Sequence, residues 1–401
     1  MMKAGRIFVA IPAMDEWESL PLTLRDLASQ EGVPPFEVHL CINQPDSYWD
    51  IPEKRGICDR NRQTLQYLHS FSGLDLHVLD RTSRGQGWPP RRQGVGWARK
   101  TLFDSILQTA ADDDLIVSLD ADTHILPHYL QSVAATMARH PECPALAVPY
   151  YHPLTGVEHQ DRAILRYELY MRNYALNLLH IGSPYSFTAL GSAIVMRVGA
   201  LRKIGGITPV QSGEDFYLLQ KFRKMAPIGL YNEVAVYPSA RLSDRVPFGT
   251  GPAVAKGRNG DWESYPVYHH THFESIAETY RLLPQLYLED VETDFLVFLQ
   301  KQFNEEHLWD SIRQNVTDFE HFERAFHQKA DGLRILQYLR QQHREHPSPD
   351  EVALHDNLQL WIPDRLPEGY TPKLSFDEFP VSQMDRLRDL LFALENEWRK
   401  I

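Results

Sequence analysis

Two patterns of hydrophobic and polar residues alternate along the first part of the chain. Short apolar runs rich in β-branched residues are typical of buried strands, and longer segments with apolar residues at helical spacing are typical of helices. The predicted strands are 6–11, 36–42, 76–79, 115–119, 145–149, 192–198 and 234–236, and the predicted helices are 20–30, 53–70, 97–110, 126–139, 161–179 and 216–224. This alternation predicts an α/β fold with a mostly parallel sheet and helices on both faces.

The pattern changes near residue 270, where strand signals fade and helical spacing dominates. Helices are predicted over 276–288, 293–303, 316–341 and 382–400. We therefore expect two parts, an α/β domain over 1–265 and a mainly helical region over 266–401. The apolar faces of the C-terminal helices are expected either to pack within the chain or to form a homo-oligomer surface.

Two carboxylates follow the predicted strand 115–119. Asp120 and Asp122 have side chains on the same side of an extended chain. They also lie where open α/β sheets bind ligands, at the carboxyl end of a strand. Carboxylates this close repel each other unless a cation or a proton lies between them. Taken alone, the pair is compatible with a metal site, a phosphoryl-transfer site or a helix cap.

The composition limits the classes of partner and the cellular compartments that are compatible with the sequence. The chain has 41 basic and 53 acidic residues and a net charge of −12. This argues against nucleic acid as a partner, because such proteins carry a basic footprint. The three cysteines, Cys41, Cys58 and Cys143, form no C-x-x-C motif and favour a reducing compartment. No apolar run approaches the roughly 20 residues of a transmembrane helix, and no signal peptide is evident. We therefore expect a cytoplasmic protein, with peripheral attachment to a membrane left open.

Four short motifs occur in a fixed order. They are Ile11–Glu16 (IPAMDE), Gly94–Lys100 (GVGWARK), Leu119–Asp122 (LDAD) and Gly213–Asp215 (GED). In this order they resemble the motifs of family 2 glycosyltransferases with the GT-A fold, over roughly residues 5–250. The resemblance implies an enzyme of the hexosyltransferase class, which moves a sugar from a nucleoside-diphosphate-sugar donor to an acceptor hydroxyl.

The resemblance assigns the aspartate pair to a metal ion, Mn²⁺ or Mg²⁺. Asp122 would bind the metal directly, and Asp120 would contact the ribose of the donor or a metal-bound water. Carboxylate oxygens are ligands that both ions accept. The ion would neutralise charge on the departing diphosphate.

The resemblance also assigns the catalytic groups. Asp215 would be the general base that deprotonates the acceptor hydroxyl, and Glu214 would orient the acceptor or the base. A base without a second, nucleophilic carboxylate implies a single displacement with inversion at the anomeric carbon. The alternative is that both residues are acidic first-turn residues favoured by the helix dipole.

The end of the first strand is expected to hold the nucleoside. By resemblance, the residues that line the base and ribose are Pro12, Ala13 and Glu16, and Pro12 is also expected to end the strand. The chain departs from the family where Asp15 replaces the usual Asn, and where Asn43 follows the second strand in place of the usual Asp. An amide offers both a donor and an acceptor, so the choice between UDP and GDP stays open.

Basic residues cluster just before and within the second motif, at Arg84, Arg91, Arg92, Arg99 and Lys100. Of these, we expect Arg99 or Lys100 to face the diphosphate, since arginine in particular binds phosphate bidentately. The loop 241–251 has two arginines and is expected to close over the donor. The histidines His269, His270 and His272 were weighed as further metal ligands, but loop or packing roles are favoured.

Two rival interpretations remain. The segment Val117–Thr123 (VSLDADT) also resembles the first motif of haloacid-dehalogenase-like phosphatases, in which Asp120 would attack phosphorus and Asp122 would act as acid. That motif normally lies on a first strand, whereas three strand–helix units precede it here. The other alternative is a non-catalytic nucleotide-sugar-binding protein. The sequence leaves the sugar and the acceptor open.

Overall fold

The computed structural model describes residues 5–210, 213–241, 262–366, 370, 372 and 374–400. By its internal contacts the chain divides into two compact units. The first comprises residues 1–160 and 189–256, and the second comprises residues 161–188 and 257–401. The expected domain boundary near residue 265 stays a prediction. Residues 161–188 belong to the same compact unit as the C-terminal helices.

A six-stranded sheet forms the centre of the first unit. Its order is β3-β2-β1-β4-β7-β6. The strands are β1 Ile7–Ala13, β2 Phe36–Asn43, β3 Asp75–Arg81, β4 Leu115–Ser118, β6 Ala145–Ala147 and β7 Ile194–Arg197. Strands β1 to β4 are parallel to one another, and β7 is antiparallel to β4 and β6. The predicted fold class, an α/β protein with a mostly parallel sheet, is confirmed.

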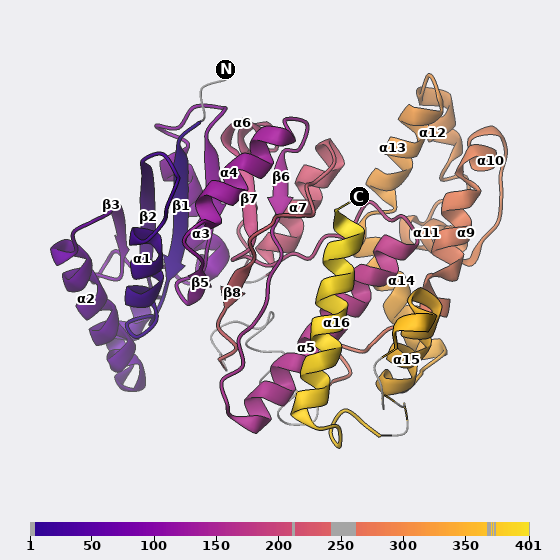
Figure 1. Ribbon diagram of the computed structural model, residues 1–401. Helices are drawn as coiled ribbons and strands as arrows, with labels where there is room; N and C mark the ends of the chain where they lie inside the picture. Colours follow the sequence, from indigo (N-terminus) through magenta and orange to yellow (C-terminus); the bar gives the residue numbers. More distant parts are fainter. Residues whose placement is uncertain are drawn as a thin grey trace. The chain divides into compact units, whose positions relative to one another are not determined.

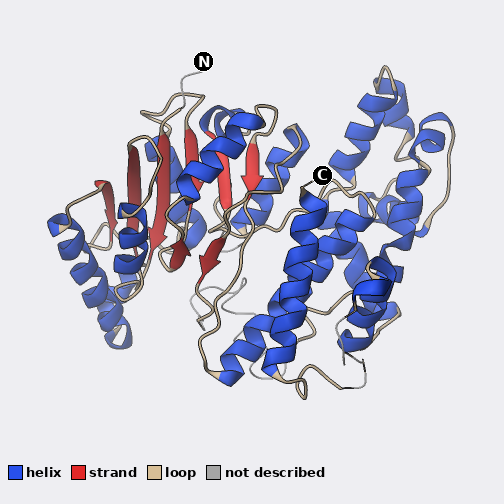
Figure 2. Cartoon of the chain, in the orientation of Figure 1, coloured by secondary structure: helices blue, strands red, loops and turns tan. Residues whose placement is uncertain are grey.

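Helices flank this sheet on both faces (Figure 2). They are α1 Leu20–Ala28, α2 Arg55–Ser70, α3 Val95–Ile106, α4 Tyr129–Arg139, α6 Val198–Lys203 and α7 Glu214–Met225, with the 3₁₀ turns η1 Asp46–Asp50 and η2 Pro52–Lys54. A second, two-stranded sheet pairs β5 Thr123–Ile125 with β8 Val236–Pro238. Strand β5 was not predicted. Its three residues follow the aspartate pair directly and pair with β8 rather than with the main sheet.

The prediction that Pro12 ends the first strand is wrong, because β1 continues to Ala13. The carbonyl of Ala10 accepts from the N–H of Leu119, so that side of β1 faces β4. Pro12 is two residues further along, so its backbone groups point to the same side, but β4 ends at Ser118. Proline therefore removes no ladder bond here, and the strand continues by pairing with β2 alone.

The second unit is helical. Its first helix is α5 Glu158–His180, of which the first three residues belong to the first unit. The elements that follow are η3 His270–Phe273, α9 Glu274–Arg281, α10 Leu283–Leu288, α11 Asp294–Phe303, α12 Asp310–Asn315, α13 Phe319–Lys329, α14 Gly332–Glu345, α15 Asp350–Trp361, η4 Pro363–Arg365 and α16 Val381–Arg399. The predicted single helix 316–341 is two helices. The first, α13, ends at Lys329, and Asp331 caps the second, α14, where its side chain accepts from the N–H of Arg334. None of the described helices is long and apolar enough to cross a membrane.

Helices α5 and α16 lie side by side (magenta and yellow in Figure 1), and buried charges join them. Arg172 is 1% exposed, and its guanidinium pairs with Glu168 at 2.7 Å and with Glu395 at 2.6 Å. Glu395 also pairs with Arg399 at 2.6 Å. Buried carboxylates are costly unless they are paired, so this network depends on each of its members.

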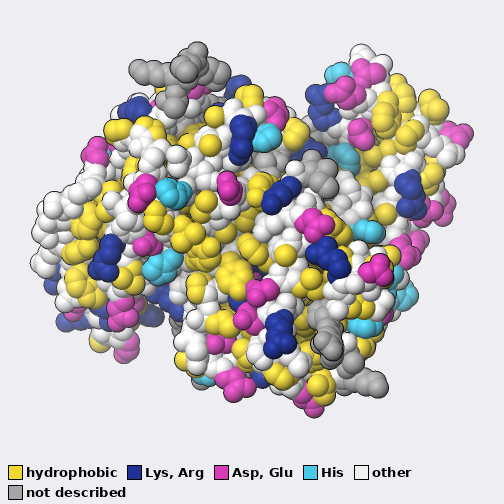
Figure 3. Space-filling model, in the orientation of Figure 1, with side chains coloured by type: hydrophobic (Ala, Val, Ile, Leu, Met, Phe, Trp, Pro, Cys, Tyr) yellow, Lys and Arg dark blue, Asp and Glu magenta, His cyan; other side chains and the backbone are white. Residues whose placement is uncertain are grey.

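Charged side chains of both signs are interspersed on the face of the molecule in Figure 3, among the described residues. Basic side chains on this face do not gather into a continuous surface. This distribution agrees with the net charge of −12.

Replacing Arg172 tests the buried network. We expect Arg172→Met to lower the free energy of unfolding by about 3–5 kcal/mol, because Glu168 and Glu395 would then be buried without their shared cation. Urea unfolding followed by circular dichroism measures this. The control is Arg365→Met, which removes an exposed ion pair with Glu397 and should cost about 0–1 kcal/mol. Equal effects of the two changes would contradict the expectation.

Candidate active site

The carboxyl ends of β1 and β4 bring the first and third motifs together. After β4 the chain turns, and the N–H of Thr123 donates to the carbonyl of Asp120 at 3.2 Å. Thr23 of α1 donates its hydroxyl to the carbonyl of Ala121 at 2.9 Å, and Ser239, after β8, donates its N–H to the carbonyl of Asp122 at 3.1 Å. The backbone of the aspartate pair is therefore held from two sides.

A buried arginine joins two of the other predicted residues. Arg99 of α3 is 4% exposed. One terminal nitrogen of its guanidinium donates to Asp120 and the other donates to Glu214, the first residue of α7. Burial by itself would lower the pKa of Arg99, but the neighbouring carboxylates, Asp120 first, outweigh it and raise the pKa, so this side chain is a permanent cation. We call Arg99, Asp120, Glu214 and Asp215 the arginine cluster.

Gly191 makes the space that Arg99 occupies. A Cβ atom at this position would overlap the guanidinium group. The carbonyl of Gly191 accepts from the hydroxyl of Ser118, at the end of β4, at 2.8 Å. Sequence analysis missed Gly191, whose only signal is a lone glycine before a strand pattern.

Asp215 is half-buried at the start of α7. Burial and, next, the charge of Glu214 raise its pKa to about 7, although Arg99 acts in the opposite direction. The N–H of Phe216 donates to its Oδ1 at 2.8 Å. A carboxyl group with a pKa near neutrality can both accept and release a proton at physiological pH, as a general base must.

A second arginine holds the other half of the aspartate pair. Arg241, just after β8, lies with its Nε 2.9 Å from Oδ2 of Asp122, and it also pairs with Glu16. The exposed fraction of the Asp122 side chain is 19% and that of Glu16 is 8%. We call Arg241, Asp122 and Glu16 the second cluster. The rest of the predicted donor-closing loop, from residue 242, lies outside the described residues.

The donor set fits a hard divalent cation that is shared with a ligand. Asp120 and Asp122 offer carboxylate oxygens, and Mg²⁺ and Mn²⁺ take oxygen ligands. Within the described part of the chain, the pair belongs to no closed group of three His, Cys, Asp or Glu ligands. Mg²⁺ is usually bound by one or two carboxylates together with water and substrate phosphates.

The predicted nucleoside residues lie at the ends of β1 and β2. Asn43 is 4% exposed. Its amide donates to the carbonyl of Ala13 at 2.9 Å and accepts from the indole of Trp88 at 3.0 Å. Pro12 and Ala13 are buried within β1. In this structure Asn43 therefore positions Ala13, and its role in reading the base stays a prediction.

The other predicted basic residues do not join these clusters. Lys100 pairs with Asp104 one turn along α3, at 2.8 Å, and Arg84 pairs with Asp50. Arg92 lies over the ring of Trp97. The histidines His269, His270 and His272 belong to the second unit, where His269 pairs with Asp356. Lys100 as a diphosphate ligand stays a prediction.

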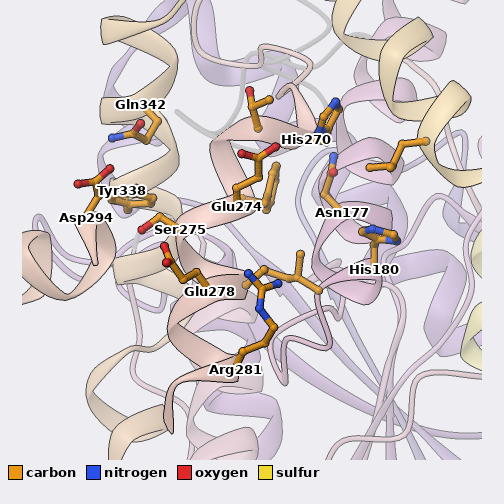
Figure 4. Close-up of a pocket in the computed structure, with 15 residues that line it drawn as sticks. Asn177, His180, His270, Glu274, Ser275, Glu278, Arg281, Asp294, Tyr338 and Gln342 are labelled. Carbon is orange, nitrogen blue, oxygen red and sulfur yellow. Dashed lines mark ion pairs between the residues drawn. The ribbon is translucent and has the colours of Figure 1, made fainter. Parts of the chain in front are cut away.

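The second unit contains a polar pocket of about 570 Å³ (Figure 4). Side chains of α5, α9 and α14 line it, including His180, Glu278, Arg281 and Tyr338. Apart from His270, none of the residues weighed for donor, metal or catalytic roles lines this pocket.

No protein-family model matches the chain, and no curated protein matches its sequence. Solved structures do match. TarS from S. aureus in complex with UDP-GlcNAc is 16% identical, with 98% of this chain and 89% of that chain covered and a TM-score of 0.41. GalNAc-T7 with UDP, GalNAc and Mn²⁺ is 13% identical (66% and 49% covered, TM-score 0.40). Glucosyl-3-phosphoglycerate synthase from Mycobacterium tuberculosis, with Mn²⁺, UDP and phosphoglyceric acid, is 14% identical (64% and 79%, TM-score 0.37).

The raised pKa of Asp215 makes stability depend on pH. The folded protein holds the proton up to a pH of about 7, whereas an unfolded Asp releases it near 3.8. Folding is therefore favoured least once the pH has risen above 7. Asp215→Asn has no proton to lose at this position. As the pH rises from about 4 to about 7, its free energy of unfolding should therefore increase relative to that of the wild type. Full linkage would give about 4 kcal/mol, and partial exposure reduces this to about 2–3 kcal/mol.

Urea unfolding of both proteins between pH 4 and pH 8 measures this difference. The matched control is Asp104→Asn, at an exposed aspartate of the same unit. A difference between wild type and Asp215→Asn that does not change with pH would contradict the raised pKa.

Proposed function

We propose that this protein is a glycosyltransferase that moves a sugar from a nucleoside-diphosphate sugar to an acceptor hydroxyl, with Mn²⁺ or Mg²⁺ as cofactor. The observation that carries the proposal is the arginine cluster. It combines a proton-accepting carboxyl group, Asp215, with a carboxylate of the predicted metal pair, Asp120, at the carboxyl edge of the sheet. Open α/β sheets bind nucleotides at this edge.

The charge of the two clusters supports the need for a cation. Five carboxyl groups belong to them, and only two guanidinium groups balance these. A diphosphate adds further negative charge, and like charges at such distances repel strongly in a partly buried site. A divalent cation held by Asp122 and Asp120 would remove this repulsion and stabilise the departing diphosphate.

Asp215 is proposed to be the base. Its carboxylate would take the proton of the acceptor hydroxyl while that oxygen bonds to the anomeric carbon and the diphosphate leaves. Glu214 is held by the buried Arg99, so it is suited to orienting rather than to taking a proton. Burial and the charge of Glu214 raise the pKa of Asp215 to about 7, which suits a group that takes a proton. A single base implies a single displacement and inversion of the anomeric carbon.

Arg241 is proposed to exchange partners when the donor binds. It now pairs with Asp122, the residue assigned to the metal. A cation at Asp122 would compete with the guanidinium, which could then pair with a phosphate oxygen, a good bidentate partner for arginine. Arg241 therefore acts against metal binding before the donor arrives and assists donor binding afterwards.

The phosphatase interpretation asks Asp120 to be a nucleophile. The ion pair with the buried Arg99 stabilises its carboxylate, and stabilising a nucleophile's charge lowers its reactivity. An aspartyl-phosphate at Asp120 would nevertheless overturn the proposal. Nucleotide-sugar binding without turnover, under conditions that retain metal and acceptor, would favour the binding-protein alternative.

Asp215→Asn tests the base. We expect sugar transfer, or slow hydrolysis of the donor where no acceptor is known, to fall by about 10²–10⁴-fold, with donor affinity retained. Wild-type kcat/KM should rise with pH through about 7, since only the ionised carboxylate takes a proton. A screen of nucleotide sugars with Mn²⁺ by thermal shift identifies the donor for this assay. Unchanged turnover in Asp215→Asn would exclude it as the base.

Arg241→Gln tests the proposed exchange. Without donor, we expect Mn²⁺ to bind up to about fivefold more tightly, since removing a part-exposed ion pair is worth up to about 1 kcal/mol. Affinity for the donor should fall. Isothermal titration with Mn²⁺ and then with donor measures both. Asp122→Asn should lose Mn²⁺ binding, and Arg202→Gln, at an exposed ion pair with Asp112, is the control. Weaker Mn²⁺ binding by Arg241→Gln would refute the exchange.

A further inference from the structure

Three metal-ligating side chains converge on strands β2 and β3, away from both clusters. Glu37 and His39 are two residues apart on β2 and share one face of the sheet. His77 on β3 is directly opposite His39 in the strand register. The two imidazole rings are stacked, with centroids 4.5 Å apart. One ligand atom from each residue lies within 4.8 Å of the others.

The distances within this group match a tetrahedral metal site. Oε2 of Glu37 lies 3.4 Å from Nε2 of His39 and 3.4 Å from Nε2 of His77. Ligands that bind zinc at about 2.0–2.2 Å with tetrahedral geometry are about 3.3–3.5 Å from one another. A good N–H···O hydrogen bond is shorter, at about 2.7–3.2 Å. The spacing therefore suits a shared cation better than direct hydrogen bonds.

We propose that Glu37, His39 and His77 bind one divalent transition-metal ion of the zinc class. Two imidazoles and one carboxylate form a known ligand set for Zn²⁺, with the fourth position left to water. To converge on one ion, the ring of His77 must rotate out of its parallel stack. Its side chain is 47% exposed, and besides the stacked ring it contacts Glu37 and Asp75, each at 3.4 Å.

The contacts of Glu37 leave one of its oxygens facing the imidazoles. Its Oε1 pairs with Arg6 at 3.2 Å. Its Oε2 is the oxygen that lies 3.4 Å from both histidines. His39 is 4% exposed, so the sheet holds its ring in place.

This site is separate from the proposed catalytic site and does not depend on its function. Glu37 lies near the start of β2, and Asn43 lies at its end, about 20 Å away at 3.3 Å per residue. The ligand types differ too, because imidazole favours Zn²⁺ whereas Mg²⁺ and Mn²⁺ favour oxygen. Since β3 is the edge strand of the sheet, the metal would tie that edge to its neighbour.

We expect affinity in the micromolar range. Metal-bound histidines usually donate their second ring N–H to a partner, which contributes about 10–100-fold in affinity. The Nδ1 atom of His39 is buried and has no hydrogen-bond partner among the described residues. His39 therefore lacks the second hydrogen bond that would increase the affinity for the metal.

The experiment is titration of chelator-treated full-length protein with Zn²⁺ in excess Mg²⁺, which occupies the aspartate pair. We expect one Zn²⁺ per chain, with affinity at least about 10-fold weaker in His77→Ala and in Glu37→Gln. The matched control is His69→Ala, which removes an exposed histidine on α2 of the same unit. At about 100 times its Kd, Zn²⁺ should raise the wild-type Tm by roughly 5–10 °C.

Substitution with Co²⁺ gives an independent readout. Intense visible absorption is expected when Co²⁺ is bound in a four-coordinate site, and His77→Ala should lose it while keeping a wild-type circular dichroism spectrum. The proposal is overturned if wild type binds no stoichiometric Zn²⁺ in excess Mg²⁺. It is equally overturned if His77→Ala and Glu37→Gln, both folded, bind Zn²⁺ as tightly as His69→Ala.

Discussion

The buried guanidinium of Arg99 is the interaction on which the candidate active site depends. It holds Asp120, which follows β4, and Glu214, which begins α7, on its two terminal nitrogens. These residues are far apart in sequence, and the buried carboxylate of Glu214 would be costly without a cation. Gly191 supplies the space beside β4 that the guanidinium needs. One arginine thus joins the motif assigned to the metal and the motif assigned to the base.

The same arrangement explains why neighbouring carboxyl groups have different properties. Glu214 and Asp120 are paired with Arg99. Asp215 is next to Glu214 but has its main contact with the N–H of Phe216. Burial and the charge of Glu214 therefore raise the pKa of Asp215 to about 7. These carboxyl groups therefore differ because of their surroundings and not because of their residue type.

The strand ends illustrate how far local pattern predicts structure. Predicted strands 6–11 and 36–42 became β1 and β2 with ends within two residues, because buried parallel strands have continuous apolar runs. Pro12 was expected to end β1, yet it lies on a side where β4 has already stopped. That outcome depends on the length of a strand more than a hundred residues away. The unpredicted β5 likewise exists through its pairing with β8.

The sequence by itself determined the α/β class, the alternation of strands and helices in the first part of the chain, and the candidate residues Asp120, Asp122, Glu214 and Asp215. Periodicity and motif order are local, and so they can be read without coordinates. Only the tertiary structure decided the partners of these residues: Arg99 for Asp120 and Glu214, Arg241 for Asp122, and Trp88 for Asn43. It alone placed His77 opposite His39. Ion pairs and strand registers join residues that are distant in sequence, and no local pattern carries that information.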